Sequence, residues 1–132
     1  ALLLVVQVAL GGLVSSRHAG LACPDWPSCR DGLWFPAWEG PLGLQLVHRT
    51  NAYALVLCLA GAALAARRAP ALRRATRLAL LLGLAQIAVG VANVLLELRI
   101  EVTGLHSALA AGLVLSVTWA AREAWLGRPR RA

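Results

Sequence analysis

The chain has 132 residues, of which 59% are hydrophobic and 14% are charged, and its mean hydropathy is +0.68. Soluble domains contain about 25% charged residues, so this composition excludes an ordinary soluble domain, a disordered chain and a disulfide-rich secreted module. The charges are gathered into short segments, which leaves apolar stretches close to the roughly 20 residues that cross a bilayer as a helix. The sequence therefore predicts an integral membrane protein without a separate soluble domain.

Four apolar segments follow one another, at residues 1–16, 42–66, 78–96 and 104–121. They predict one all-α domain over residues 1–132, a bundle of four transmembrane helices with an outer loop at 17–41. The first segment is short for a full crossing, and because the chain starts at Ala1 without methionine, we expect residues ahead of it. A cleaved signal peptide is the alternative, but neither the basic leader nor the small-residue cleavage site that it requires is visible.

The positions of the arginines predict the orientation in the membrane. The chain has 13 basic residues and a net charge of +7. Most of the arginines lie between the second and third segments or after the fourth: Arg67, Arg68, Arg73, Arg74, Arg77, Arg122, Arg128, Arg130 and Arg131. By the positive-inside rule these ends are cytoplasmic. We therefore expect a multi-pass protein of a prokaryotic inner membrane, with both termini on the cytoplasmic side and the loop 17–41 on the outer side. Attraction to anionic lipid headgroups accounts for the remaining positive charge, so no nucleic-acid partner is expected.

A short internal repeat relates the two halves of the chain. The step from Gln7 to Gly11 matches the step from Gln86 to Gly90, and His48 in the second segment matches His106 in the fourth. Each half is predicted to be a helical hairpin that returns inward with a histidine near its outer end. Two hairpins in the same orientation are related by a pseudo-twofold axis along the membrane normal. Leucine-rich helices align by chance, so the histidines are the informative part of the match.

His48 and His106 are ionisable residues within the predicted outer half of the membrane. Such residues are costly unless they face the bundle interior and find a partner. Under the pseudo-twofold both imidazoles point at the central axis, an arrangement that suits two axial ligands on one haem iron. A zinc site needs more ligands, and only Gln45 and Asn51 are near. We therefore predict haem ligation by His48 and His106, and a core histidine without a ligand role is the alternative.

Other polar and small residues of the spans have two interpretations. Gln7, Gln86 and Asn93 are explained by interhelical hydrogen bonds. Gly11 and Gly90 either allow close helix packing or make room for a flat macrocycle. Arg49, directly after His48, either donates to a haem propionate or extends to the outer interface.

The outer loop contains Cys23 and Cys29 in a proline-stiffened turn on the oxidising side of the membrane. A disulfide is expected there, and it either staples the loop over the bundle or exchanges with an outside thiol carrier. Four aromatic residues of the loop are typical of an interfacial belt, or they form a lid over a haem edge: Trp26, Trp34, Phe35 and Trp38. Cys58, in the middle of the second segment, is predicted to be an inert core thiol.

Together these residues resemble the haem A synthase family. The resemblance rests on the string Gly20-Leu-Ala-Cys-Pro-Asp-Trp-Pro-Ser-Cys29, the Val47-His48-Arg49 step, and the stretch from Gln86 to His106. In that family two similar four-helix halves are fused, and the enzyme oxidises the C8 methyl group of haem O to the formyl group of haem A, using a bound haem b. The resemblance implies that His48 and His106 are the axial pair of one half, and that Cys23 and Cys29 are its loop cysteines.

The chain departs from the family pattern in two ways. It corresponds to one half, so an eight-helix unit requires a homodimer or a partner membrane subunit. The family's substrate-binding half has a glutamate one helical turn before the His-Arg step, where this chain has Gln45, which cannot act as a general base. The resemblance thus implies the half that holds haem b, and the catalytic residues stay unassigned.

Three function hypotheses follow. The first is a haem A synthase-type oxidoreductase that acts as a dimer, with haem O or haem A as substrate or product. The second is a bis-histidine b-type membrane cytochrome that transfers electrons without hydroxylation, which Gln45 favours. The third is a quinone-linked thiol oxidoreductase that uses Cys23 and Cys29. This hypothesis leaves both histidines unexplained. A purely structural subunit is a further alternative, and it also leaves them unexplained.

Overall fold

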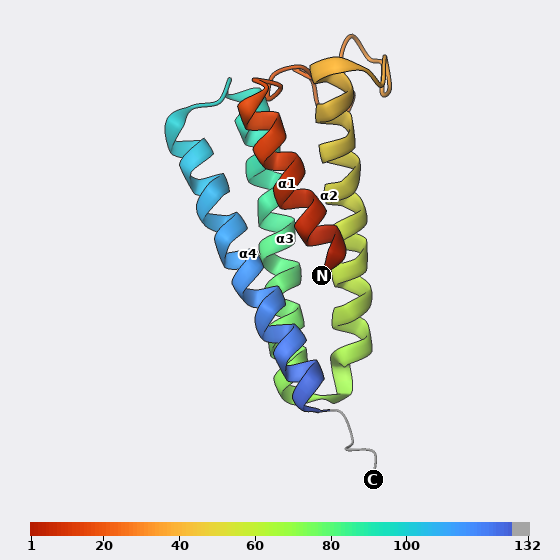
Figure 1. Cartoon of the computed structure of the whole chain (residues 1–132), viewed down its shortest axis with the longest axis vertical. Helices are drawn as coiled ribbons and strands as arrows, with labels where there is room; N and C mark the ends of the chain where they lie inside the picture. Colours follow the sequence, from red (N-terminus) through yellow and green to blue (C-terminus); the bar gives the residue numbers. More distant parts are fainter. Residues whose placement is uncertain (128–132) are drawn as a thin grey trace.

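The computed structural model describes residues 1–127, which form a bundle of four α-helices. In chain order the helices are α1 (Leu2–Ser16), α2 (Gly40–Ala65), α3 (Pro70–Leu95) and α4 (Ile100–Leu126), with a 3-10 turn, η1 (Ala66–Arg68), after α2. Successive helices run in opposite directions (Figure 1). Within the described residues the extended structure is limited to an isolated bridge between Arg30 and Leu33. The all-helical class is thus confirmed, while Arg128, Arg130 and Arg131 lie outside the described residues.

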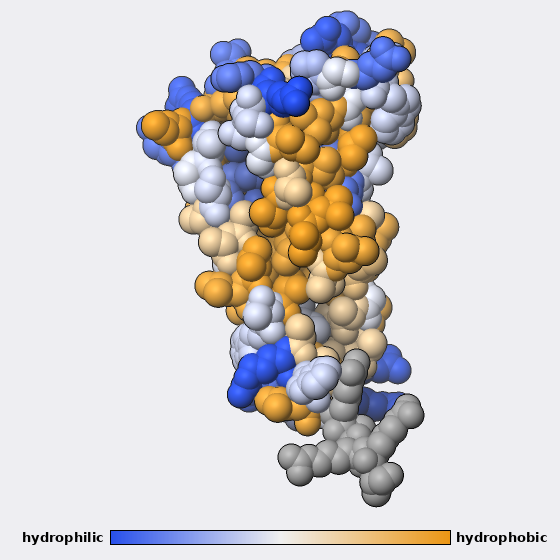
Figure 2. Space-filling model, viewed as in Figure 1, coloured by the Kyte–Doolittle hydropathy of each residue, from blue (hydrophilic) through white to orange (hydrophobic). Residues whose placement is uncertain are grey.

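Three of the four helices are long and apolar enough to cross a membrane, namely α2 with η1, α3 and α4. Helix α1 is apolar but has only 15 residues, which corresponds to about 22 Å. In Figure 1 its N-terminus lies part-way along the bundle. Figure 2 shows hydrophobic residues over the middle of the visible face and hydrophilic residues gathered toward its two ends. The molecule is a membrane protein, and the count of four spans stays a prediction.

The helix starts follow local sequence signals. Proline is present in the first turn of both α2 and α3, where its missing N–H is not needed and its fixed φ favours helix. Helix α3 begins at Pro70 and α4 continues to Leu126, so both extend beyond the apolar segments predicted from the sequence. Arginine is a good helix former, so the arginine-rich ends continue the helices past the apolar stretches.

Consecutive helices pack against one another, α1 on α2, α2 on α3 and α3 on α4. The core between them draws on every helix: Leu4, Leu55, Leu59, Ala79 and Leu113. Gly83 brings α3 close to α2, because a Cβ at this position would lie 3.0 Å from Cδ1 of Leu59. Cys58 is exposed. Its prediction as a core thiol is wrong, because the buried residues Leu55 and Leu59 fix the inward face of α2 and Cys58 lies outside it.

The loops at one end of the bundle contact each other. Leu98, in the link between α3 and α4, has a positive φ of 59° and donates its N–H to the carbonyl of Asn93 at 2.7 Å. Its side chain packs on the α1–α2 loop, where a Cβ at Gly20 would lie 3.0 Å from Leu98 Cδ1. At the start of α2, a Cβ at Gly43 would lie 2.1 Å from the carbonyl oxygen of Trp38, so this close approach requires glycine. The α1–α2 loop therefore packs against both the α3–α4 link and the start of α2 at this end of the bundle.

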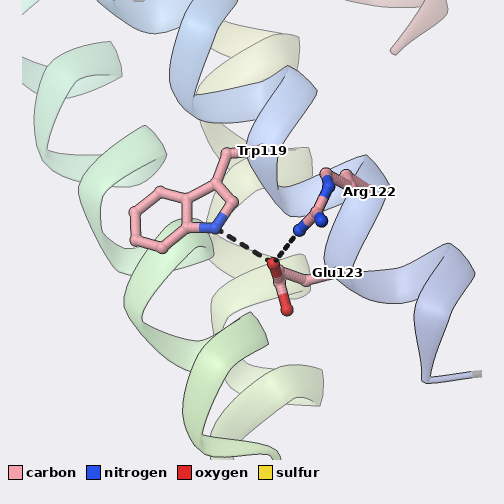
Figure 3. Close-up of polar contacts among 3 residues, drawn as sticks. All are labelled: Trp119, Arg122 and Glu123. Carbon is pink, nitrogen blue, oxygen red and sulfur yellow. Dashed lines mark hydrogen bonds and ion pairs between the residues drawn. The ribbon is translucent and has the colours of Figure 1, made fainter.

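The opposite, arginine-rich end carries a small polar cluster on α4 (Figure 3). Trp119 Nε1 donates to Glu123 Oε1 at 3.2 Å, and Arg122 Nη1 lies 3.1 Å from the same oxygen. Tryptophan with a polar partner is typical of the boundary between hydrocarbon and water. This cluster is consistent with an interfacial position for the end of α4.

Candidate haem site

The two histidines of the repeat lie at similar depths from the loop-bearing end. His48 follows the start of α2 at Gly40, and His106 follows the start of α4 at Ile100, which places them about 12 Å and about 9 Å along their helices. Both residues are half-buried. The structure thus brings the two residues that the sequence pairs to one level of the bundle.

The imidazole of His48 contacts two residues of α1. Gln7 Nε2 lies 3.2 Å from His48 Nδ1 and 3.4 Å from His48 Nε2. The other end of the Gln7 amide, Oε1, accepts a hydrogen bond of 2.7 Å from Nδ2 of Asn51. Asn51 Nδ2 also donates to the backbone carbonyl of Leu3 at 3.1 Å. A Cβ at Gly11 would lie 3.4 Å from His48 Cε1, so the imidazole edge packs against the backbone of α1.

His106 contacts the matching residues of α3, Gln86 through its backbone carbonyl and Gly90 through the edge of its imidazole. Gln86 Nε2 donates to the backbone carbonyl of His106 at 3.0 Å. Two polar atoms nearby, Gln86 Oε1 and His106 Nδ1, are buried without a hydrogen-bond partner. A Cβ at Gly90 would lie 3.2 Å from His106 Cε1. Each histidine is therefore contacted by the glutamine of one repeat and has the glycine of that repeat against its Cε1 edge.

These residues fit a bis-histidine haem. Two imidazoles from different helices of a bundle are the donor set that a six-coordinate haem iron takes. A buried polar atom without a partner, such as His106 Nδ1, is rare in a finished core and points to a missing ligand or group. Between residues 1 and 127 there is no group of three or more His, Cys, Asp or Glu side chains that could hold a metal ion. The donor set matches haem better than zinc, which takes four protein ligands in structural sites.

Arg49 holds the disulfide loop. Its Nη1 donates to the carbonyl oxygens of Asp25 at 3.0 Å and Ser28 at 3.2 Å, and its Nη2 donates to the carbonyl of Cys23. All three acceptors belong to the loop closed by the bond between Cys23 and Cys29. The sequence predicted either a haem propionate or the interface as the destination of this side chain, and the contact with loop carbonyls was missed. Its part in binding haem stays a prediction.

The disulfide predicted from the sequence is present, and it is buried. Cys23 and Cys29 are 0% and 1% exposed, and they pack on Leu46 and Leu42 of α2. A buried disulfide is shielded from an outside thiol, so its position favours the staple over thiol exchange. The loop aromatics are exposed, with Phe35 stacked on Trp38 at a centroid distance of 5.4 Å. Their exposure suits an interfacial belt.

Gln45 lies one helical turn before His48 and is 5% exposed. Its Nε2 donates to the carbonyl of Gly20 at 3.2 Å, and its Oε1 is buried without a partner. The side chain thus connects α2 to the α1–α2 loop. Because its side chain is a neutral amide, this position one turn before His48 carries no carboxylate.

Comparison with known proteins decides the family. A family model described as a cytochrome oxidase assembly protein matches residues 1–118. The chain belongs to the haem A synthase family. This membership confirms the resemblance drawn from the cysteine loop and the His-Arg step.

Several curated proteins are similar to this chain. The haem A synthase of Rhizorhabdus wittichii is 36% identical over 90% of this chain and 37% of its own length. The haem A synthase of Chelativorans sp. is 34% identical over 80% of this chain and 33% of its own length. A protohaem IX farnesyltransferase of Halobacterium salinarum is 33% identical over 93% of this chain and 31% of its own length. The chain therefore spans well under half of these relatives, and no solved structure matches it.

Proposed function

We propose that this chain is a haem-binding unit of the haem A synthase type, in which His48 and His106 ligate a b-type haem. The observation that carries the proposal is the equivalence of the two histidines. They lie at similar depth on α2 and α4, and each has a glutamine and a glycine of the preceding helix against it. The reaction served is the oxidation of the C8 methyl group of haem O toward haem A, as the family membership suggests.

The residues of the chain have separate parts in this proposal. His48 and His106 hold the iron, and the backbones at Gly11 and Gly90 leave room for the imidazole edges. Arg49 and the disulfide hold the outer loop against the start of α2. A bound b-type haem supplies one-electron redox chemistry. Since Gln45 is an amide, acid–base chemistry on the substrate depends on a second copy of the chain or a partner membrane subunit.

The membrane topology belongs to the same proposal. Arg67, Arg68 and the arginines at the start of α3 lie at the end of the bundle opposite the disulfide loop (Figure 1). Under the positive-inside rule this end faces the cytoplasm and the disulfide loop faces outward. The short helix α1 then completes a fourth span, and the two hairpins are related by a pseudo-twofold axis along the membrane normal. The C-terminal end of α4 then lies at the cytoplasmic end, and α1 begins part-way along the bundle and runs outward from the cytoplasmic side.

A b-type cytochrome that only transfers electrons is the second candidate. Two histidine ligands leave no open position on the iron, and Gln45 supplies no carboxylate, which favours this function. The quinone-linked thiol oxidoreductase is disfavoured by the burial of Cys23 and Cys29 and gives no role to the two histidines.

The identity of the extracted haem tests the proposal. The protein is expressed in cells that make haem O but lack their own haem A synthase, with and without a separately tagged second copy of the chain. Acid extraction and chromatography then identify the haems in the membranes and in the purified protein. Haem A that appears with the wild-type chain and not with His48→Ala supports the synthase function. Haem B alone overturns it in favour of the cytochrome, and a protein without any haem overturns both.

A further inference from the structure

The two glutamines of the repeat present opposite groups to the two histidines. On α1, the backbone carbonyl of Leu3 can only accept, so the Asn51 group beside it is the donor Nδ2. The same Nδ2 faces Gln7, which therefore turns its acceptor Oε1 toward Asn51. This leaves the Gln7 donor, Nε2, against the His48 ring. A fixed backbone carbonyl thus determines the polarity of the whole chain of hydrogen bonds.

A donor at this place competes with a metal ion. A neutral imidazole has one unprotonated ring nitrogen, and that nitrogen supplies both the hydrogen-bond acceptor and the metal-binding lone pair. When Gln7 Nε2 donates to either ring nitrogen of His48, the lone pair is occupied. His48 must therefore lose the hydrogen bond from Gln7 before it can ligate iron, so the loss of this bond lowers the net gain from ligation.

The environment of His106 has the reverse polarity. The Gln86 donor, Nε2, is engaged with the His106 carbonyl, so the group left over is the acceptor Oε1, which is buried without a partner. His106 Nδ1 is also buried without a partner, and the His106 imidazole makes no hydrogen bond within residues 1–127. When Nε2 of a histidine ligates a metal, Nδ1 carries the proton, and such histidines almost always donate it to a nearby acceptor. Gln86 Oε1 is a free acceptor on the helix packed against α4; it is not bonded to His106 Nδ1 in the structure, and this bond would form when His106 Nε2 ligates the metal and Nδ1 carries the proton.

We infer that the two axial ligands are unequal: His106 is the first and stronger ligand, positioned by Gln86, and His48 is a second, exchangeable ligand held back by Gln7 and Asn51. The inference rests on the proposed haem site and adds an order to its assembly. His106 would hold the haem iron first, and His48 would bind it only after its hydrogen bond with Gln7 opens. Gln86 is a positioning residue, since it acts on the iron through His106.

Haem titration of matched variants tests the inference, because equivalent substitutions in the two repeats have opposite expected effects. Gln7→Leu removes the competing donor, so the detergent-purified apoprotein is expected to bind haem roughly two- to tenfold more tightly, the worth of one hydrogen bond. Gln86→Leu removes the acceptor and is expected to weaken binding roughly tenfold or more. The controls are Gly12→Ala on α1, where a Cβ meets nothing within 4 Å, and Ala88→Leu on the exposed face of α3. Affinity changes of the same sign in both glutamine variants, or no change in Gln86→Leu, would overturn the inference.

Two further readouts separate this role from a structural one. The haem midpoint potential rises in Gln86→Leu, because the ligand loses the acceptor that increases its basicity, and it is unchanged in Ala88→Leu. His48→Ala retains five-coordinate haem on His106, whereas His106→Ala loses most of its haem. If the leucine variants do not fold, Gln7→Met and Gln86→Met replace them with an unbranched side chain of similar length. Haem binding that survives both histidine substitutions defeats the proposed function itself, whereas equal losses in the two histidine variants defeat only the inequality.

Discussion

Arg49 Nη1 lies 3.0 Å from the carbonyl oxygen of Asp25, so the residue next to a proposed haem ligand is bound to the disulfide loop. The same guanidinium reaches the carbonyls of Ser28 and Cys23. A charged donor gives stronger hydrogen bonds than a neutral one, about 1.5 to 3 kcal/mol each. The loop is thus fixed to α2 at the turn that carries His48.

Substitution of Arg49 is expected to release the loop. In Arg49→Gln the disulfide should be reduced roughly tenfold faster or more, because the loop opens more readily without the charged donor. The measurement is maleimide labelling of Cys23 and Cys29 after mild reductant, in a Cys58→Ser background that removes the exposed third thiol. Arg30→Gln is the control, since Arg30 makes a single longer bond of 3.4 Å to Ala22. Equal reduction rates in the two variants would contradict the role of Arg49 as the loop clamp.

Removal of the disulfide is expected to lower stability and leave haem in place. The Cys23→Ser and Cys29→Ser double variant should lose about 2 kcal/mol, since a native disulfide typically contributes 2–4 kcal/mol and this loop is short. Its haem content should equal that of the wild type, because Cys23 and Cys29 pack on Leu46 and Leu42, whereas the imidazole of His48 contacts Gln7 and Gly11. Thermal denaturation in detergent and pyridine haemochrome quantification measure the two effects. Loss of haem from the double variant would place the loop within the binding site.

The glycines beside the imidazoles should be sensitive to added side chains. Gly90→Ala puts a methyl group 3.2 Å from His106 Cε1, closer than an ordinary contact, whereas Gly11→Ala puts one 3.4 Å from His48 Cε1. Haem affinity is expected to fall more in Gly90→Ala than in Gly11→Ala, and not at all in Gly12→Ala. Haem titration of the three variants provides the comparison. Equal affinity in all three would show that the imidazoles do not depend on this space.

Gly43 supports the loop and not the haem site directly. A Cβ there would lie 2.1 Å from the Trp38 carbonyl oxygen, so Gly43→Ala must displace backbone. The expected loss is about 3 kcal/mol, at the upper end for overpacking. Gly61→Ala, on the same helix with nothing within 4 Å, is the control and should be neutral or slightly stabilising. Melting temperatures in detergent measure the difference, and similar values for the two variants would show that the start of α2 can adapt.

The sequence predicted the helical class, the disulfide and the family, because these depend on composition and on local motifs, whereas haem ligation by His48 and His106 stays a prediction. The Gln-x-x-x-Gly step repeats once per half, and a spacing of four places both residues on one helix face. Their contacts with His48 and His106 follow from that geometry once the hairpins form. The sequence predicted interhelical hydrogen bonds for Gln7 and Gln86, but not that their partners include the two histidines.

The contacts of Arg49, Asn51 and Cys58 could not be predicted in the same way. Arg49 binds carbonyls of a loop whose path depends on tertiary packing, and Asn51 pairs with Gln7 only because α1 crosses α2 at that level. Cys58 lies in the part of α2 after Tyr53, which is apolar on all sides, so periodicity does not distinguish its buried face from the face that meets lipid. Each of these positions is decided by neighbours distant in sequence.

The reduced-minus-oxidised optical spectrum of the detergent-purified wild type, His48→Ala and His106→Ala tests the haem assignment most directly. The wild type should show a low-spin b-type signal, and each histidine variant should lose it while still being inserted in the membrane. His48→Ala should retain high-spin haem and His106→Ala very little. A low-spin spectrum that is unchanged in both variants would contradict ligation by His48 and His106.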